Sequence, residues 1–275
     1  MNTKHGVFCA LSLSATAAFC LALAGCGGGN SADSLSRIQK DGVMRWGADA
    51  SGGAPFVFEK DNAVIGFEMD VMDKLAAHMK VKHERVQADW DALIDNMLAG
   101  RTDIVVNGIE INEARQKVVD FTVPYCAYEQ QLTVRAEDKD KYKTLDDLKG
   151  KPIATLKAAE ANNVLKTAGF SEDLIKPQSD SSIPYTELEN KRVEAVLQES
   201  CIAGYYAAPK TNLYNVPKTF SPGKYAIAVR KGNPKLVAEL NRVIELMKTN
   251  GELAAIYKKW NIWADAQKTM GIVEK

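Results

Sequence analysis

Hydrophobic and polar positions follow two different periodicities along this chain. Short runs of apolar or alternating residues, such as Val43–Ala48 and Ile153–Leu156, predict β-strands. Elsewhere apolar residues recur at about every fourth position, as they do from Phe67 to Met79, which predicts a helix packed on a sheet. Strands and helices of this kind alternate from Ser34 onward. The pattern therefore predicts an α/β fold with much parallel sheet.

The same two periodicities predict the remaining elements of the chain. Further strands are expected at Lys82–Gln87 and at residues 56–58, 103–109, 130–135, 195–197 and 225–229. Helices are expected at residues 36–40, 89–99, 158–168, 183–191, 202–208 and 251–260 and at Pro234–Thr249.

The first 25 residues are predicted to be an export signal. Lys4 precedes an uncharged stretch that is apolar up to Ala24, and Leu23-Ala24-Gly25-Cys26 resembles a bacterial lipobox. In that interpretation Cys26 is lipidated and becomes the first residue of the mature protein. The alternative is an uncleaved membrane anchor, since the apolar run approaches the roughly 20 residues that a spanning helix needs. The glycines that follow favour cleavage, with residues 26–36 as a flexible tether.

Charge and cysteine content exclude several classes of protein. The chain has 35 basic and 35 acidic residues with no basic stripe, so nucleic-acid binding has no electrostatic support. Of its five cysteines, two lie in the predicted signal and one is the predicted lipid site, which leaves Cys126 and Cys201. A bond between these two in an oxidising compartment and two unpaired buried thiols both remain open. The histidines lack metal-ligand spacing, so we predict no metal and no cofactor.

The segment of residues 107–125, NGIEINEARQKVVDFTVPY, carries the clearest chemistry. It begins at the end of a predicted buried strand, where Gly108 lets another group approach the backbone. Arg115 follows seven residues later, and an Arg just beyond a strand end can bind a carboxylate through two parallel hydrogen bonds. A helix Arg in a solvated salt bridge is the plainer alternative.

This segment closely resembles the signature of the family-3 extracytoplasmic solute-binding proteins, G-x-T-I-T-x-x-R-x-K-x-x-D-F-S-x-P-Y. Other stretches resemble the family in the same order, among them GFEMDVMDKLA, ADWDALI, LAGRTDIVVNGI, TLDDLKGKPIATL and GELAAIYKKW. The resemblance implies a two-lobed, type II periplasmic binding protein-like fold with two crossover strands. Lobe 1 would comprise residues 37–125 and 226–275, lobe 2 residues 130–220, and the hinges residues 125–129 and 221–225.

The resemblance also implies a function. Such proteins are receptors of ABC importers, and this one would be held outside the inner membrane by its lipid anchor alone. It would capture an amino acid or a related amine-bearing solute between its closing lobes and deliver it to an ABC permease. In the family the residues at the positions of Gly108, Glu110 and Arg115 grip the α-carboxylate of the ligand. Glu199 stands where the family usually has the Asp that holds the α-ammonium group.

Two further residues are candidates by position. Asp49 ends the first predicted strand and lies at the predicted cleft mouth. Trp90 follows Asp89 at a helix start, where its ring can face the ligand, and a cationic ligand would gain about 0.5–2 kcal/mol from such a face. Packing in the core is the alternative for Trp90.

The chain departs from the family pattern in ways that add negative charge. Glu110 replaces the usual Thr, and Ala158-Ala159-Glu160 replaces the Gly-Thr type loop of lobe 2. The predicted cleft thus contains Arg115, with Lys157 nearby, against four acidic residues, which are Asp49, Glu110, Glu160 and Glu199. We therefore hypothesise a ligand more positive than a neutral amino acid, such as a basic amino acid or an amine-bearing metabolite. Alternatively, Glu110 pairs with Arg115 and never meets the ligand.

An enzyme on the same fold is the second interpretation. The chain also resembles periplasmic cyclohexadienyl dehydratases, in which a cleft carboxylic acid protonates a leaving hydroxyl group. Glu110, Glu160 or Glu199 would serve if burial raised its pKa. Because the sequence shows no nucleophile–base pair and no metal set, we predict a binding protein and not an enzyme.

Overall fold

The computed structural model describes residues 33–51, 53–157 and 159–275. The predicted signal peptide (residues 1–25), Cys26 and most of the predicted tether lie outside the described residues. Helix α1 (Ser34–Asp41) begins inside the stretch predicted as tether. Each helix in the described ranges is too short or too polar to span a bilayer.

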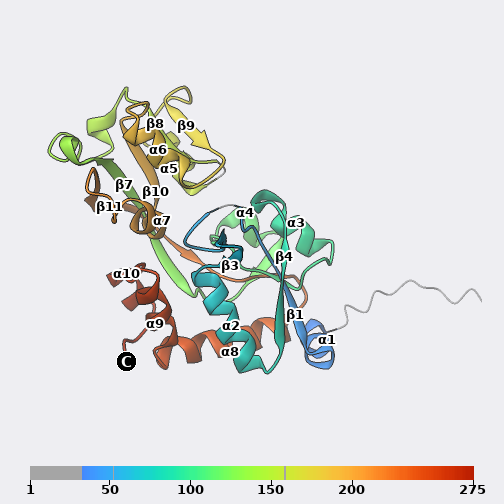
Figure 1. Ribbon diagram of the computed structural model, residues 1–275. Helices are drawn as coiled ribbons and strands as arrows, with labels where there is room; N and C mark the ends of the chain where they lie inside the picture. Colours follow the sequence, from blue (N-terminus) through green and yellow to red (C-terminus); the bar gives the residue numbers. More distant parts are fainter. Residues whose placement is uncertain (1–32, 52, 158) are drawn as a thin grey trace, which may run out of the picture. The chain divides into compact units, whose positions relative to one another are not determined.

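The first sheet is built from both ends of the described chain. Its strand order is β4 (Lys82–Gln87), β1 (Val43–Ala48), β5 (Ile104–Val105), β12 (Ala228–Arg230) and β6 (Val119–Phe121). Strand β1 runs parallel to β4 and β5, whereas β12 runs antiparallel to β5 and β6. Around this sheet lie α1, α2 (Phe67–Met79), α3 (Leu93–Leu98), α8 (Pro234–Thr249) and α9 (Glu252–Lys259), as Figure 1 shows.

The second sheet is formed by the middle of the chain. Its order is β11 (Leu213–Tyr225), β7 (Cys126–Arg135), β10 (Ala195–Glu199), β8 (Ile153–Leu156) and β9 (Ile175–Gln178). Strand β7 is antiparallel to both neighbours, whereas β8 is parallel to both of its neighbours. The helices of this part are α5 (Glu160–Thr167), α6 (Ile183–Glu189) and α7 (Ser200–Tyr206).

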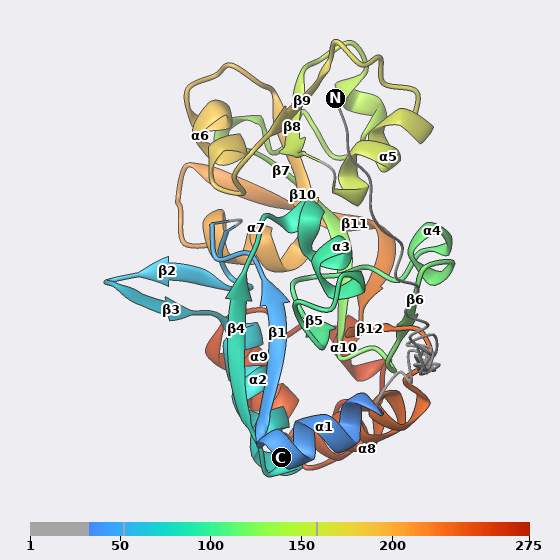
Figure 2. The same ribbon diagram turned by 90° about the vertical axis from the view of Figure 1, so that its right-hand side faces the viewer.

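The remaining elements are short. Strands β2 (Phe58–Lys60) and β3 (Ala63–Ile65) form a hairpin that projects beside β4 in Figure 2. Helices α4 (Glu113–Gln116) and α10 (Asp265–Lys268) have about one turn each, as do the 3₁₀ helices η1 (Trp90–Ala92), η2 (Ala136–Asp138) and η3 (Asp146–Leu148).

Apolar side chains at helical spacing build the core of the first sheet. The predicted face of α2 is buried, with Phe67, Val71 and Leu75 fully inaccessible to solvent. A separate apolar cluster, which includes Leu132 and Leu197, fills the second sheet. The core around α2 also extends to the second sheet, because its cluster includes Ala154 of β8 and Val196 of β10. Burial of this apolar surface is the main stabilising contribution to the fold.

Two passages of the chain connect the sheets, one from β6 to β7 and one from β11 to β12. The strands at these passages pair with each other, with Tyr225 opposite Cys126. Strands β7 and β11 extend through the predicted hinges. The bounds of the lobes and hinges stay a prediction. Cys126 and Cys201 are both buried and unpaired.

Several predicted elements lie where expected and others do not. Strands β1, β4 and β8 and helix α8 have the predicted bounds. The strand predicted over residues 103–109 is wrong in length, because only Ile104–Val105 pairs in the sheet. The backbone N–H of Gly108 instead donates to a buried carboxylate, that of Glu68, which takes the chain out of the ladder.

Candidate functional site

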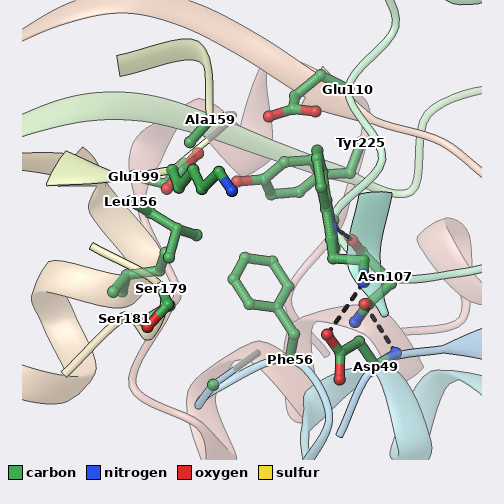
Figure 3. Close-up of a pocket in the computed structure, with 15 residues that line it drawn as sticks. Asp49, Phe56, Asn107, Glu110, Leu156, Ala159, Ser179, Ser181, Glu199 and Tyr225 are labelled. Carbon is green, nitrogen blue, oxygen red and sulfur yellow. Dashed lines mark hydrogen bonds between the residues drawn. The ribbon is translucent and has the colours of Figure 1, made fainter. Parts of the chain in front are cut away.

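A cavity lies between elements of the two sheets (Figure 3). The space between its walls is about 640 Å³ when space open to solvent is included. From the first sheet and its loops it is lined by Asp49, Gly53, Phe56, Trp90, Asn107, Gly108 and Glu110. From the rest of the chain it is lined by Leu156, Lys157, Ala159, Ser179, Ser181, Glu199, Ile202 and Tyr225.

The walls from the two sheets touch at one side of this cavity. A Cβ atom placed on Gly53 would lie 2.8 Å from Oγ of Ser181, so the two backbones approach closely there. The cavity is therefore lined by residues from both halves of the protein.

The carboxylate of Asp49 accepts hydrogen bonds from neighbouring protein groups. Its Oδ1 accepts hydrogen bonds from Ser51 N at 2.9 Å and Gln87 Nε2 at 2.9 Å, and its Oδ2 accepts from Trp90 N at 3.1 Å. Burial raises the pKa of Asp49, but these hydrogen bonds outweigh it and hold the pKa below its ordinary value. Asp49 therefore borders the cavity while it fixes the loop that carries Trp90.

Glu110 and Arg115 form an ion pair. Arg115 Nη1 donates to the carboxylate of Glu110 and also to its backbone oxygen, at 3.1 Å. The guanidinium carbon lies 5.1 Å from the ring centroid of Trp90. Trp90 in turn donates through Nε1 to the backbone oxygen of Asn107, at 3.0 Å. The expected alternative of a Glu110–Arg115 pair is thus present, yet Glu110 still lines the cavity.

Gly108 adopts a left-handed backbone conformation, with φ of +59°. A Cβ atom there would lie 2.9 Å from Cε1 of Phe56, so the group that approaches this backbone is a ring of the protein itself. The Gly108 N–H donates to Glu68 Oε1 at 2.7 Å. The same carboxylate accepts from the hydroxyl of Tyr125. Burial raises the pKa of Glu68 to about 7 despite these hydrogen bonds.

Glu199 is a buried acid at the cavity wall. It ends β10, is 4% exposed, and its Oε2 has no hydrogen-bond partner among the described residues. Burial raises the pKa of Glu199 to about 8, and the negative charge of Glu110 contributes to the rise. An unpartnered buried oxygen at a cavity wall is well placed to bind a donor on a ligand.

Tyr225, which the sequence did not single out for the site, lies beside both acids. Glu110 and Tyr225 form an isolated antiparallel backbone bridge, and Figure 3 shows the Tyr225 ring close to the carboxyl group of Glu110. The rings of Tyr225 and Tyr128 stack with centroids 4.3 Å apart. A side chain on Gly223 would meet the Tyr128 ring at 2.2 Å, so its absence leaves room for the stack.

The structure brings most of the predicted site residues together. Asp49, Trp90, Gly108, Glu110 and Glu199 line the cavity, and Arg115 lies behind Glu110. Glu160 borders a different surface hollow and accepts a hydrogen bond from Asn163 at 3.0 Å. The binding roles predicted for these residues stay predictions.

Sequence patterns did not single out several further lining residues, which are Phe56, Asn107, Leu156, Ser179, Ser181 and Ile202. Phe56 follows a proline at a predicted strand start, and this context gave a structural interpretation. Ser179 and Ser181 lie in a loop without a motif. No group of three or more metal-ligating side chains occurs within the described part of the chain.

A family model described as bacterial extracellular solute-binding proteins, family 3, matches residues 44–262. The chain belongs to this family. The resemblance seen in the segment of residues 107–125 is thereby confirmed.

Curated relatives of this family-3 protein have related names. The L-cystine-binding protein TcyJ of Escherichia coli (strain K12) is 29% identical over 229 residues, which cover 82% of this chain and 85% of the relative. A probable histidine-binding protein of Neisseria gonorrhoeae is 29% identical over 267 residues, which cover 94% of this chain and 96% of the relative.

Solved structures support the fold of this family-3 protein. An ancestral amino acid-binding protein described as a precursor of cyclohexadienyl dehydratase aligns with a TM-score of 0.74 and 31% identity, over 83% of this chain and 99% of that chain. An ancestral arginine-binding protein bound to arginine aligns with a TM-score of 0.70 and 34% identity, over 80% of this chain and 98% of that chain. The predicted two-lobed α/β fold class is confirmed.

Proposed function

We propose that this family-3 protein is the receptor of an ABC importer and that it captures an amino acid or a related amine-bearing solute between two closing lobes. The observation that carries the proposal is the cavity itself, whose walls come from both sheets and which has an acidic group on each side. A ligand favours closure only if it binds the closed form more tightly, and contacts to both lobes provide that difference.

The names of the relatives support this class of solute. Those relatives are named for cystine and histidine, and a structural neighbour holds arginine. The lobes proposed are residues 37–125 with 226–275 and residues 130–220, hinged at residues 125–129 and 221–225. Glu110 and Glu199 contact the solute in this proposal, while Asp49, Gly108 and Arg115 hold the lobe-1 wall and Trp90 presents its ring.

Calorimetric titration with amino acids and amines, combined with small-angle scattering, tests the receptor function. We expect at least one solute to bind with release or uptake of heat and to reduce the radius of gyration. Ala159→Trp should abolish that binding because Ala159 lines the cavity, whereas Lys176→Trp on exposed β9 should not. Flat titrations and unchanged scattering across the whole panel would contradict the proposal.

We further propose that Cys26 carries the lipid that anchors this receptor to the membrane. The lipobox-like sequence Leu23-Ala24-Gly25-Cys26 supports it. Cys26→Ser should remove incorporated fatty acid and release the protein from the membrane fraction. Cys20→Ser, in the same predicted signal, should leave both unchanged. Retention of fatty acid in the Cys26→Ser variant would contradict the anchor.

A dehydratase is the second candidate, and we propose that this chain does not act as one. The observation that favours an enzyme is Glu199, a buried acid whose raised pKa of about 8 keeps its proton available near neutral pH. One neighbour is described as the precursor of cyclohexadienyl dehydratase. We expect no conversion of prephenate or arogenate by the purified protein, and measured turnover of either would establish the enzyme instead.

A further inference from the structure

The guanidinium of Arg115 is already engaged through Nη1, and Arg115 is not among the residues that line the described cavity. Its Nη1 is bound by the carboxylate of Glu110 and by the Glu110 backbone oxygen, and the Trp90 ring covers it at 5.1 Å. Glu110 and Trp90 line the cavity, whereas Arg115 is absent from its described walls. A carboxylate entering the cavity would therefore meet the negative charge of Glu110 before it reached the guanidinium.

The opposite wall presents a second acid that lacks a partner. Glu199 is 96% buried, and its Oε2 has no hydrogen-bond partner within the described ranges. A buried polar atom of this kind costs free energy unless a donor reaches it. An ammonium group of a solute would supply that donor together with a compensating charge.

Apolar and aromatic side chains form another part of the cavity wall. Phe56, Leu156, Ile202 and Tyr225 line the cavity, and Figure 3 shows Phe56, Leu156 and Tyr225 directed into it. A chain of methylene groups can pack against such a surface, and aromatic rings also favour a nearby cation.

Two other charged residues, Asp49 and Lys157, line the cavity. The carboxylate of Asp49 is occupied by donors from Ser51, Gln87 and Trp90. Lys157 is exposed, and it forms no ion pair with any residue that the structure describes. Because Lys157 lines the cavity, its ammonium group is a competing anchor for a solute carboxylate.

We propose that the solute is an aliphatic amine with a positive charge at each end and no α-carboxylate, held between Glu110 and Glu199. The carboxylate of Glu110 already pairs with the guanidinium of Arg115, which would otherwise bind a carboxylate of the solute. The protein therefore supplies the carboxylates of this site, and the solute supplies two cationic groups. This inference rests on the proposed receptor function and narrows its class of solute.

Matched pairs of solutes test the inference directly. Lysine and cadaverine, ornithine and putrescine, and arginine and agmatine differ within each pair by the carboxylate alone. Calorimetric titration of the purified protein should show that at least one decarboxylated member binds ten-fold or more tightly than its amino acid. Equal affinity within every pair, or tighter binding of the amino acids, overturns the inference and leaves the receptor function intact. Absence of binding by any solute in the wider panel contradicts the receptor function itself.

Variants at both ends of the cavity provide the second arm of the test. Glu110→Gln removes the charge and releases the guanidinium, so amine affinity should fall at least ten-fold while the affinity for the matched amino acid rises. Glu113→Gln removes an equal charge from the exposed surface of α4 and should change neither affinity. Glu199→Gln should weaken amine binding without improving amino-acid binding, and it keeps the test decisive if Glu110→Gln does not fold. Unchanged amine affinity in both cavity variants overturns the inference.

Discussion

The side chain of Gln267 binds both polar backbone groups of Ala127. Its Oε1 accepts from Ala127 N at 3.0 Å, and its Nε2 donates to Ala127 O at 2.8 Å. Gln267 is 2% exposed, so these hydrogen bonds are shielded from water. Ala127 lies in β7 just after the first passage between the sheets, and a residue from the end of the chain therefore fixes that passage.

Removal of this contact should destabilise the protein. Gln267→Ala leaves two backbone groups of Ala127 without these partners, and each buried unsatisfied group costs roughly 1–3 kcal/mol. We expect a lower free energy of unfolding in urea. Lys268→Ala, at a neighbouring exposed position of α10, should change it by less than about 1 kcal/mol. Equal stabilities of the two variants would show that the hydrogen bonds between Gln267 and Ala127 do not stabilise the protein.

The contact between Gly108 and Phe56 predicts a coupled pair of substitutions. Gly108→Ala places a Cβ 2.9 Å from the Phe56 ring and forces a non-glycine residue to a φ of +59°. We expect a loss of stability of about 1–3 kcal/mol. In a Phe56→Ala background, the part of this loss that comes from the clash with the Phe56 ring should disappear. The part that comes from the unfavourable backbone conformation should remain. A double-mutant cycle of unfolding free energies separates the two, and a coupling energy near zero would rule out the steric contribution.

The raised pKa of Glu68 predicts that stability falls as pH rises. Burial raises this pKa from an ordinary value of 4.5 to about 7, so between these values the folded protein holds a proton that the unfolded chain has lost. The contribution of Glu68 to the unfolding free energy therefore decreases with rising pH across this window, by up to about 3 kcal/mol, and does not change above it. Glu199, with a pKa of about 8, acts in the same direction.

Urea denaturation at pH values from 5 to 8 measures this dependence. Glu68→Gln keeps the acceptor oxygen for Gly108 and Tyr125 but has no titrating proton, so its stability should decline less with pH than that of the wild type. Glu84→Gln, at an exposed position, serves as the control and should decline like the wild type. A slope for Glu68→Gln equal to the wild-type slope would show that Glu68 does not titrate differently in the folded state.

Binding of a cation should release a proton from Glu199. The pKa of this buried acid is raised to about 8, so at pH 7 the empty cavity mostly holds it protonated, whereas a bound ammonium group favours the carboxylate. Affinity should therefore rise with pH, by up to ten-fold per unit, until about pH 8, and should then level off. Titrations in buffers of different ionisation enthalpy report the released proton. The release should vanish in Glu199→Gln and persist in Glu113→Gln, and its persistence in Glu199→Gln would assign it to another group.

Sequence patterns predicted the parts of the fold that depend on local periodicity. The helix Pro234–Thr249 and the strand Val43–Ala48 have the predicted bounds because their apolar spacing matches the face that they bury. Strand β11 was missed because Pro217 and Pro222 argue against a strand interior. In the structure both prolines lie on a strand at the edge of the sheet, where a missing N–H is tolerated.

The sequence predicted many of the residues that line the site, but few of the contacts that those residues make. The signature segment located Gly108, Glu110 and Arg115, since their spacing alone matched the family. Whether Glu110 would face the cavity or the guanidinium depended on loop geometry. In the structure it pairs with Arg115 and also lines the cavity. The position of Tyr225 next to Glu110 follows from strand register across more than a hundred residues, which no local pattern encodes.

Strand β11 has a consequence for how an exported chain avoids self-association. An uncovered sheet edge offers free N–H and C=O groups to a second copy and can seed intermolecular β-pairing. Pro217 and Pro222 are exposed along that strand, and its register is interrupted between residues 215 and 219 and again between 220 and 223. Each interruption shortens the regular edge on which a neighbouring molecule could pair, so we expect the two prolines to reduce aggregation outside the cytoplasm.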